Sequence, residues 1–202
     1  MIKIALAKGR LAQHLLDKLA AVGITFPDYS EKSRKLIFQD ATGCYSIVFV
    51  KPSDVGIYVE KGACDLGVAG RDTLLESQPD VYEMLDLGCG KCRFAVAGPE
   101  GFQQKPGQKL RVATKYPNVA KSYFAKNGQP IEIIQINGSV ELAPLMGLAD
   151  VIVDIVETGA TLKENGLAVL TEITEISARL IVNKVSLKTK QEEVTNLLAK
   201  LR

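Results

Sequence analysis

The feature of this sequence that most limits its fold is a regular alternation between short apolar runs and helix-spaced apolar residues. Residues 2–7 form the first apolar run, and Leu11, Leu15 and Leu19 then recur at helical spacing until Gly23 ends the pattern. Strands that alternate with helices in this way form parallel sheets whose faces the helices cover. The sequence therefore predicts an α/β protein.

The same patterns continue along the 202 residues. Residues 35–39 and 44–51 flank the turn 40–43 and are predicted as a hairpin. Further apolar runs span residues 65–69, 81–87, 111–114, 131–136, 151–156, 167–176 and 178–184. The pattern of residues 81–87 is that of an edge strand. The Gly- and Pro-rich stretch 98–107 interrupts the pattern. Helices are expected from a cap at Ser53 to Gly62, from Pro117 to Gly128, after a cap at Ser139, and from the capping box Thr189–Glu192 onward.

Two segments of the chain resemble each other. Residues 62–66 and 147–151 both lead from a helix end, through an aspartate, into an apolar strand. Glycine turns follow at residues 70–74 and 159–162, a pattern that favours two lobes built on one plan, with the second lobe beginning near Lys91. Connections between helices and strands often look alike, and that simpler interpretation stays open. If the repeat holds, we expect the two turns to face each other across an inter-lobe cleft.

Bulk properties exclude several classes of protein. A net charge of +2 and a pI near 8.3 fall short of the dense Lys/Arg stripe of a nucleic-acid-binding chain, so no nucleic acid is expected. The N-terminal apolar run is broken by Lys3 and is too short for a signal sequence or a membrane span. We therefore expect a cytoplasmic protein with no membrane partner.

The four cysteines do not form a recognisable disulfide framework, and we expect reduced thiols. Cys89 and Cys92 have the spacing of half a zinc site or of a redox pair. The sequence offers only His14 to complement them, so a structural role is favoured for both cysteines. We also assign His14 no catalytic role, because it follows Arg10 on the first helix as a surface residue would.

Residues 151–162 form the sharpest local motif, a buried strand that runs into a small turn and then a helix. Backbone N–H groups at such a turn can bind a phosphate group. The residues that allow close approach or add hydroxyl donors are Thr158, Gly159, Ala160 and Thr161. Asp154 and Glu157 suit ribose hydroxyls or one Mg²⁺ shared with substrate phosphates, and no site formed by protein ligands alone is expected. A turn that merely caps a helix is the alternative.

Cationic residues follow or precede several predicted strands. They occur as Lys8-Gly9-Arg10, Ser33-Arg34-Lys35 and Gly70-Arg71-Asp72. An arginine presents a planar fork to polyphosphate oxygens, and an adjacent glycine lets backbone amides join the contact. Solvated surface charge is the alternative for each of them.

Taken in order, these motifs resemble those of the short form of ATP phosphoribosyltransferase, and the resemblance runs from end to end. It rests on residues 7–10, 33–36, 68–72, 92–94, 113–116, 137–144 and the loop from Asp154 to Thr161. The resemblance implies transfer of the phosphoribosyl group of phosphoribosyl pyrophosphate to N1 of ATP, with release of pyrophosphate, as the first step of histidine biosynthesis. It implies Mg²⁺ as the cofactor.

The resemblance also assigns roles to residues. Glu157, Thr158, Gly159, Ala160 and Thr161 would hold the sugar 5′-phosphate, and Asp154 would lie near the ribose. Arg10 and Arg34 would be the catalytic cations on pyrophosphate or triphosphate oxygens. The ATP side would be lined by Lys8, Gly9, Gly70, Arg71, Asp72 and Glu141. Adenine N1 already carries a lone pair, so no base is needed, and the cations would stabilise the leaving pyrophosphate.

The implied fold has two α/β lobes that resemble type II periplasmic binding proteins, with the active site in the inter-lobe cleft. Lobe one would comprise residues 1–90 and 178–202 and bind ATP and pyrophosphate, and lobe two would comprise residues 91–177 and bind the phosphoribosyl group. Because the chain stops at Arg202, it departs from the longer form, which carries a regulatory domain there. The short form acts as a homodimer that assembles with a regulatory subunit similar to histidyl-tRNA synthetase.

Two other functions compete with this interpretation. A nucleobase phosphoribosyltransferase also has a paired-acid phosphoribosyl loop, but here Ile155 follows Asp154 where that class usually has a second acid. A solute-binding module without catalysis is the second alternative. It would ordinarily carry a signal peptide or an effector domain, and neither is recognisable here.

Overall fold

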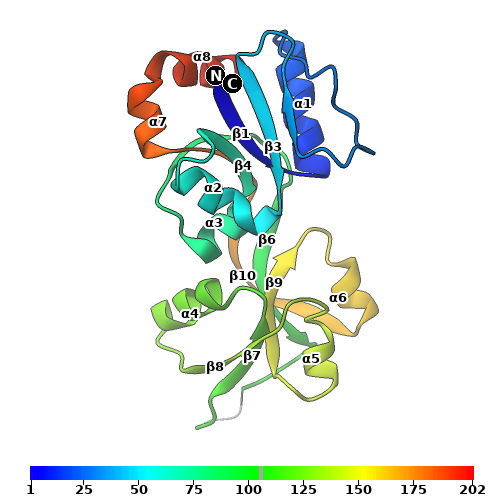
Figure 1. The fold of residues 1–202 in the computed structure, drawn as a ribbon. Coiled ribbons are helices and arrows are strands. Elements are labelled where there is room, and N and C mark those ends of the chain that lie inside the picture. The colour runs from blue at the N-terminus through cyan, green and yellow to red at the C-terminus, as the bar shows by residue number, and fades with distance from the viewer. Residues whose placement is uncertain (105–106) are drawn as a thin grey trace. The chain divides into compact units, whose positions relative to one another are not determined.

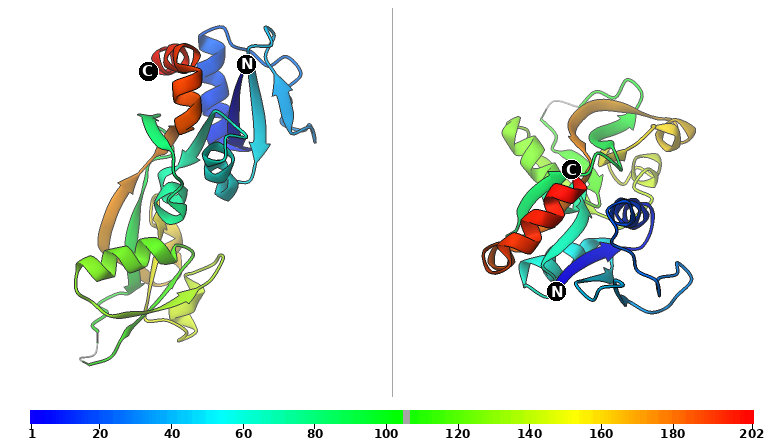
Figure 2. Two further views of the ribbon diagram at one scale, coloured as in Figure 1. Left: turned by 60° about the vertical axis from the view of Figure 1, so that its left-hand side comes forward. Right: turned by 90° about the horizontal axis from the view of Figure 1, so that it is seen from above.

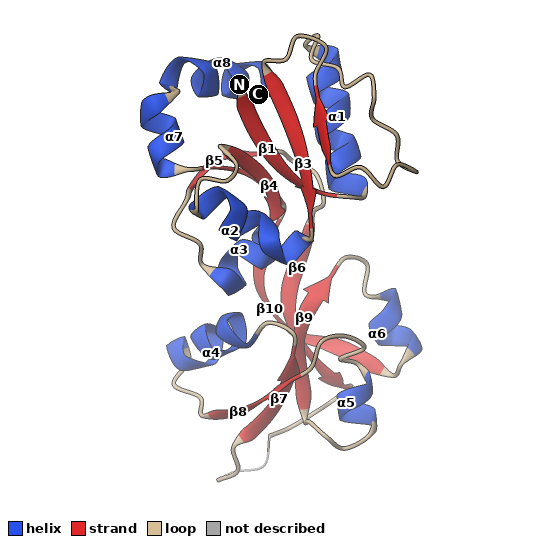
Figure 3. Cartoon of the chain, in the orientation of Figure 1, coloured by secondary structure: helices blue, strands red, loops and turns tan. Residues whose placement is uncertain are grey.

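The computed structural model describes residues 1–104 and 107–202, which divide into two compact units (Figure 1). Unit one comprises residues 1–90 and 177–202, and unit two comprises residues 91–176. Each unit has its own β-sheet with helices packed against it (Figure 3). Two residues of the Gly- and Pro-rich stretch, 105 and 106, lie outside the described residues. Among the described helices, none is both long and apolar enough to cross a membrane.

The sheet of unit one has six strands in the order β2-β3-β1-β4-β11-β5. The strands are β1 (Ile2–Ala7), β2 (Ile37–Gln39), β3 (Tyr45–Val50), β4 (Leu66–Gly70), β5 (Tyr82–Asp86) and β11 (Ala178–Val182). Its helices are α1 (Arg10–Ala21), α2 (Val55–Glu60), α3 (Arg71–Ser77), α7 (Lys184–Thr189) and α8 (Gln191–Leu201), with a 3₁₀ turn at Pro52–Asp54. Strands β3, β1 and β4 are parallel, whereas β2, β11 and β5 run antiparallel to their neighbours.

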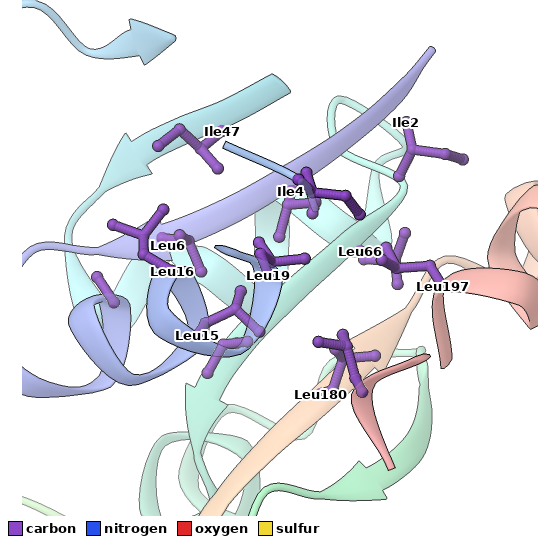
Figure 4. Packing of buried hydrophobic residues seen from close by; sticks show 14 of the residues in the cluster. Ile2, Ile4, Leu6, Leu15, Leu16, Leu19, Ile47, Leu66, Leu180 and Leu197 are labelled. Carbon is purple, nitrogen blue, oxygen red and sulfur yellow. The ribbon is translucent and has the colours of Figure 1, made fainter. Parts of the chain in front are cut away.

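Alternate residues of the central strands bury their side chains on opposite faces of this sheet. Ile4 and Leu6 of β1 pack with Leu15 and Leu19 of α1 (Figure 4). Helix α8 adds Leu197 to the same cluster, and Figure 2 shows this helix beside α1. Val55, Val59 and Leu74, from α2 and α3, cover the other face. Burial on both faces explains why β1 is almost continuously apolar.

The sheet of unit two has five strands in the order β10-β6-β9-β7-β8. Its strands are β6 (Cys92–Pro99), β7 (Leu110–Thr114), β8 (Ile131–Gln135), β9 (Val151–Val156) and β10 (Leu167–Ile176). Its helices are α4 (Pro117–Lys126), α5 (Leu142–Leu145) and α6 (Ala160–Glu164). Ala143 of α5 and Leu162 of α6 are buried with Ile152 of β9 in one apolar cluster.

The two units share a strand plan. The order β3-β1-β4-β11-β5 in unit one corresponds to β8-β7-β9-β6-β10 in unit two, with three parallel strands followed by an antiparallel one in each. Asp65 exchanges two hydrogen bonds of 2.9 Å with the backbone of Lys3, and Asp150 does the same with Arg111. Each aspartate thus ties the start of β4 or β9 to the neighbouring strand. The sequence similarity between residues 62–66 and 147–151 corresponds to this shared pair of hydrogen bonds.

Three predicted helix caps are wrong. Ser53 lies within the 3₁₀ turn, where its hydroxyl donates to Asp54 (2.9 Å), and α2 has no side-chain cap. Ser139 adopts φ = 48°, and its carbonyl, not its hydroxyl, accepts the N–H of Leu142. Thr189 ends α7 and donates back to the carbonyl of Val185. In each case another local hydrogen bond, within a turn or a helix, replaces the predicted cap.

Candidate active site

In unit one, the first group of predicted site residues follows the carboxyl end of β1. Gly9 has φ = 121°, a conformation that side chains rarely adopt, and its carbonyl accepts the N–H of Gln13 in the first turn of α1. Lys8 donates from Nζ to the carbonyl of Ser33 (2.7 Å) and lies 5.7 Å from the centre of the Phe49 ring. Lys8, Gly9 and Arg10 are exposed.

The segment that carries Arg34 is fixed on both sides of that residue. Ser33 is held by Lys8, and the carbonyl of Leu36 accepts the N–H of Phe49 (2.7 Å). Tyr29 anchors the start of the segment, because its ring lies 5.4 Å from the rings of both Phe38 and Phe49. Arg34 itself is exposed. The structure therefore brings Lys8 and the Arg34 segment together, although 25 residues separate Lys8 from Ser33.

The third predicted group, Gly70-Arg71-Asp72, lies where β4 passes into α3. A Cβ atom at Gly70 would lie 2.1 Å from Oδ1 of Asp72, so this aspartate folds back over Gly70 and any larger residue there would have to displace its carboxylate. The N–H of Arg71 donates to the carbonyl of Ser177 (3.0 Å). Within the described residues, the buried Nε of Arg71 has no hydrogen-bond partner, and Glu83 approaches it only to 4.0 Å. A buried N–H without a partner favours an acceptor supplied by a ligand.

In unit two, the loop after β9 has the shape expected of a phosphate-binding turn. Gly159 adopts φ = 81° just before α6, which lets the chain reverse without a Cβ clash. Oγ1 of Thr158 accepts the N–H of Ala160 (3.3 Å), so its hydroxyl hydrogen can point to a ligand. Glu157, Thr158, Ala160 and Thr161 are exposed, and Gly159 is half-buried. Asp154 is half-buried and pairs with Ala95 of β6.

Thr114 braces this edge of the sheet. Its hydroxyl is fully buried, donates to the carbonyl of Val153 (2.7 Å) and accepts the N–H of Tyr116 (2.8 Å). These bonds fix the carboxyl end of β7 beside β9. Lys115 is thereby presented in an exposed position 6.0 Å from the Tyr116 ring.

Glu141, which the resemblance placed on the ATP side, lies in unit two. It follows β8 and precedes α5, in the same unit as the loop from Asp154 to Thr161. Glu141 thus belongs to a different unit from Lys8, Arg34 and the Gly70 turn, all of which are in unit one.

Sequence reasoning missed two exposed lysines, Lys51 and Lys115. Each is the first residue after a parallel strand, β3 or β7. Their position at a strand end is the signal that could have identified them, since ligands of α/β sheets bind at the carboxyl ends of strands.

The described part of the chain contains no cluster of side chains that could hold a divalent cation by itself. No group of three or more His, Cys, Asp or Glu side chains there could hold a metal ion. Asp154 and Glu157 fit a Mg²⁺ ion that receives its remaining ligands from substrate phosphates and water, because Mg²⁺ prefers oxygen ligands and usually keeps several waters.

None of the four cysteines forms a disulfide within the described residues. Burial raises the pKa of Cys64 to about 11, and burial also raises the pKa of Cys89. A raised pKa keeps a thiol protonated and unreactive, unlike the thiolate of a redox pair.

Comparison with known proteins identifies the family. Residues 51–202 match the family model HisG: ATP phosphoribosyltransferase. The ATP phosphoribosyltransferase of Alkaliphilus metalliredigens is 54% identical over 201 residues, which cover 100% of this chain and 96% of the relative. That of Clostridioides difficile is 54% identical over 198 residues, covering 98% and 95% of the two chains.

Solved structures agree with this result. The ATP phosphoribosyl transferase (HisG:HisZ) complex from Thermotoga maritima has a chain that is 39% identical, with a TM-score of 0.87, over 100% of this chain and 96% of that one. The periplasmic aliphatic sulphonate binding protein SsuA of Escherichia coli has a TM-score of 0.61 at 14% identity, covering 99% of this chain and 70% of its own. That second likeness supports a fold of the periplasmic-binding-protein type. The chain belongs to the ATP phosphoribosyltransferase family, in its short form, whose members catalyse the first step of histidine biosynthesis.

Proposed function

We propose that this chain binds the two substrates of the ATP phosphoribosyltransferase reaction through the residues described above. The products are N1-(5-phosphoribosyl)-ATP and pyrophosphate. The observation that carries the proposal is the 54% identity to an ATP phosphoribosyltransferase over 201 residues. The glycine-containing loop in unit two and the exposed cations of unit one support it chemically.

The loop of unit two is proposed to hold phosphoribosyl pyrophosphate. The left-handed Gly159 leaves room for the 5′-phosphate, and Thr158 and Thr161 can donate hydroxyl hydrogens to it. Glu157 and Ala160 complete this loop. Asp154, which lies on β9 three residues before Glu157, is suited to the ribose hydroxyls.

The cations of unit one are proposed to bind the polyphosphates of ATP and of the leaving group. Arg10 and Arg34 present guanidinium forks, and Lys8 fixes the segment that carries Arg34. Gly70, Arg71 and Asp72 are proposed to contact ATP through the start of α3 and through Nε of Arg71, which has no hydrogen-bond partner within the described residues. Gly9 lets the backbone approach the same anion. Glu141 is proposed to contact ATP from unit two.

The chemistry needs no base from the protein. The lone pair of adenine N1 attacks C1 of the ribose, the bond from C1 to the pyrophosphate oxygen breaks, and pyrophosphate leaves with the electron pair. Arg10 and Arg34 stabilise the negative charge that grows on those oxygens. When Mg²⁺ is bound by Asp154, Glu157 and the phosphates, it neutralises part of the same charge.

The relative from Thermotoga maritima was solved as a HisG:HisZ complex. We extend that assembly to this chain and propose that it forms a homodimer, which then joins a regulatory subunit similar to histidyl-tRNA synthetase. Because the substrates are nucleotides and sugar phosphates of central metabolism, we place the activity in the cytoplasm.

The test is an assay of the purified protein with ATP, phosphoribosyl pyrophosphate and Mg²⁺. We expect equal amounts of pyrophosphate and phosphoribosylated ATP, and no product when either substrate is omitted. Free adenine in place of ATP should give no product, whereas a nucleobase phosphoribosyltransferase would use it. Binding of both ligands without turnover, even with the regulatory subunit present, would identify a solute-binding module and refute the proposal.

A further inference from the structure

Lys51 and Lys8 follow directly after two neighbouring parallel strands, at the carboxyl ends of those strands in the unit one sheet. Strands β1 and β3 are parallel, and their last registered pair is Ala7 with Val50. The next residue of each strand is a lysine, so the two backbones stand about 5 Å apart at that point. The register of β1 with β4, in which Ala5 pairs with Gly67, brings Gly70 to the same level.

The side chains of the two lysines leave the sheet on one face. Successive residues of a strand point to opposite faces. Leu6 and Phe49 belong to the apolar cluster on the α1 face, and Ala7 and Val50 pack on the other. Lys8 and Lys51 therefore both continue toward the α1 face, which agrees with the 5.7 Å separation between Nζ of Lys8 and the Phe49 ring.

The local sequence fixes the backbone of Lys51. Pro52 follows it, and a residue before proline is confined to extended conformations. Lys51 indeed has φ = −69° and ψ = 151°, and its carbonyl accepts the N–H of Asp54 (2.9 Å). The side chain is thus presented from a rigid strand end.

The charge of Lys51 is not neutralised by the protein. Its side chain is exposed, and within residues 1–104 and 107–202 its Nζ has no hydrogen-bond or ion-pair partner. Asp54, three residues later, accepts a hydrogen bond from the Ser53 hydroxyl (2.9 Å). Lys8, by contrast, already donates to Ser33, which leaves it fewer donors for a ligand.

We propose that Lys51 is a further polyphosphate-binding residue, which acts with Lys8 on the oxygens of a pyrophosphate or triphosphate group. The proposal deepens the proposed function and rests on it for the identity of the substrate. An ammonium group carries three donors, enough to contact oxygens of two neighbouring phosphates. Two lysines on adjacent parallel strands give a cationic edge whose spacing suits an extended polyphosphate rather than one phosphate group.

The test measures binding of inorganic pyrophosphate, with Mg²⁺ present, to the full-length protein and three variants. Lys51→Met removes the charge and keeps most of the side-chain volume, and Lys51→Arg keeps the charge. Lys188→Met is the matched control, because Lys188 is an exposed lysine of unit one on α7. Helix α7 follows β11, whose last residue pairs with the first residue of β4, so α7 begins at the end of the sheet opposite to the carboxyl ends of the parallel strands. Ribose 5-phosphate serves as a second probe for the loop of unit two.

We expect Lys51→Met to weaken pyrophosphate binding about ten- to hundredfold, as the loss of one charge-assisted contact does. Lys51→Arg should weaken it less than about threefold, and Lys188→Met should leave it unchanged. Binding of ribose 5-phosphate should be the same in all variants. If Lys51→Met bound pyrophosphate as tightly as Lys188→Met, or lost both probes equally, the proposal would be wrong. Turnover by the unaltered protein tests the proposed function separately, so the two failures are distinguishable.

Discussion

Arg34 is an exposed residue whose surroundings suit the catalytic role proposed for it. Its own side chain is in solvent, but Ser33 and Leu36 on either side are both held by hydrogen bonds to other strands or strand ends. A guanidinium on a fixed segment needs little reorganisation when charge develops on a leaving group.

We therefore predict that Arg34→Ala lowers kcat about a hundredfold while it changes ATP affinity less than about threefold. Pre-steady-state turnover and equilibrium binding of ATP measure the two quantities. Lys32→Ala, a change at an exposed cation of the same segment, is the control and should change neither. Equal losses of kcat and of ATP affinity would show that Arg34 only binds.

A second prediction concerns Gly159, for which Gly166 provides a matched control. Both have positive φ, 81° and 68°, and flank the same short helix, α6. Alanine at either position should destabilise the fold by about 1 kcal/mol through backbone strain. Only Gly159→Ala should also weaken phosphoribosyl pyrophosphate binding, which calorimetry would measure. Equal binding losses in both variants would mean that the loop geometry is not used for the phosphate.

At the scale of elements, Asp65 links four segments of unit one. Its carboxylate accepts the backbone N–H of Lys3 (2.9 Å), the hydroxyl of Ser186 (2.7 Å) and Nζ of Lys190 (2.8 and 2.9 Å). Burial by itself raises the pKa of Asp65, but the hydrogen bonds from Lys190, Lys3 and Ser186 outweigh it and lower the pKa below its ordinary value of 3.8. The charged form is therefore more stable in the folded chain than in the unfolded one.

Asp65→Asn should lower the free energy of unfolding by roughly 2–4 kcal/mol at pH 7, because Lys190 and Ser186 lose their charged acceptor. A lowered pKa contributes stability above the ordinary value of 3.8, and this contribution disappears as the pH falls through the folded-state pKa. The difference between the two proteins should therefore shrink below about pH 4. Urea unfolding at pH 7 and at pH 3 measures it, and a difference that is independent of pH would contradict the prediction.

Strand β6 is an element that the sequence patterns did not predict. Residues 92–99 end in Gly-Pro, which is typical of a break, yet β6 is a central strand between β10 and β9. A Cβ at Gly98 would lie 3.1 Å from Val151 and 3.2 Å from Leu170, so any larger residue would have to push these side chains aside, and glycine suits the close packing between strands. Pro99 is tolerated because it ends the strand.

At the scale of the whole molecule, the two units carry different parts of the candidate site. Unit one has the cations that suit polyphosphates, and unit two has the loop that suits a sugar phosphate. Each substrate should therefore stabilise a different set of backbone amides.

Hydrogen–deuterium exchange of the intact chain tests this division. Phosphoribosyl pyrophosphate should slow exchange mainly at residues 157–162, in unit two. ATP should slow it mainly at residues 8–10 and 70–74, in unit one. Protection of residues 157–162 by ATP alone, with none from phosphoribosyl pyrophosphate, would reverse the assignment of substrates to units.

The sequence by itself determined the α/β class, the hairpin around residues 40–43 and the family, because apolar periodicity, turn residues and local motifs depend on near neighbours in the chain. It also predicts that Gly159 and Gly9 lie near a phosphate, which remains a prediction. Only the tertiary structure decided which residues meet. Lys8 reaches Ser33, Asp65 holds Lys190 across 125 residues, and Lys51 stands beside Lys8. Those pairings follow from strand order and register, which long-range packing selects.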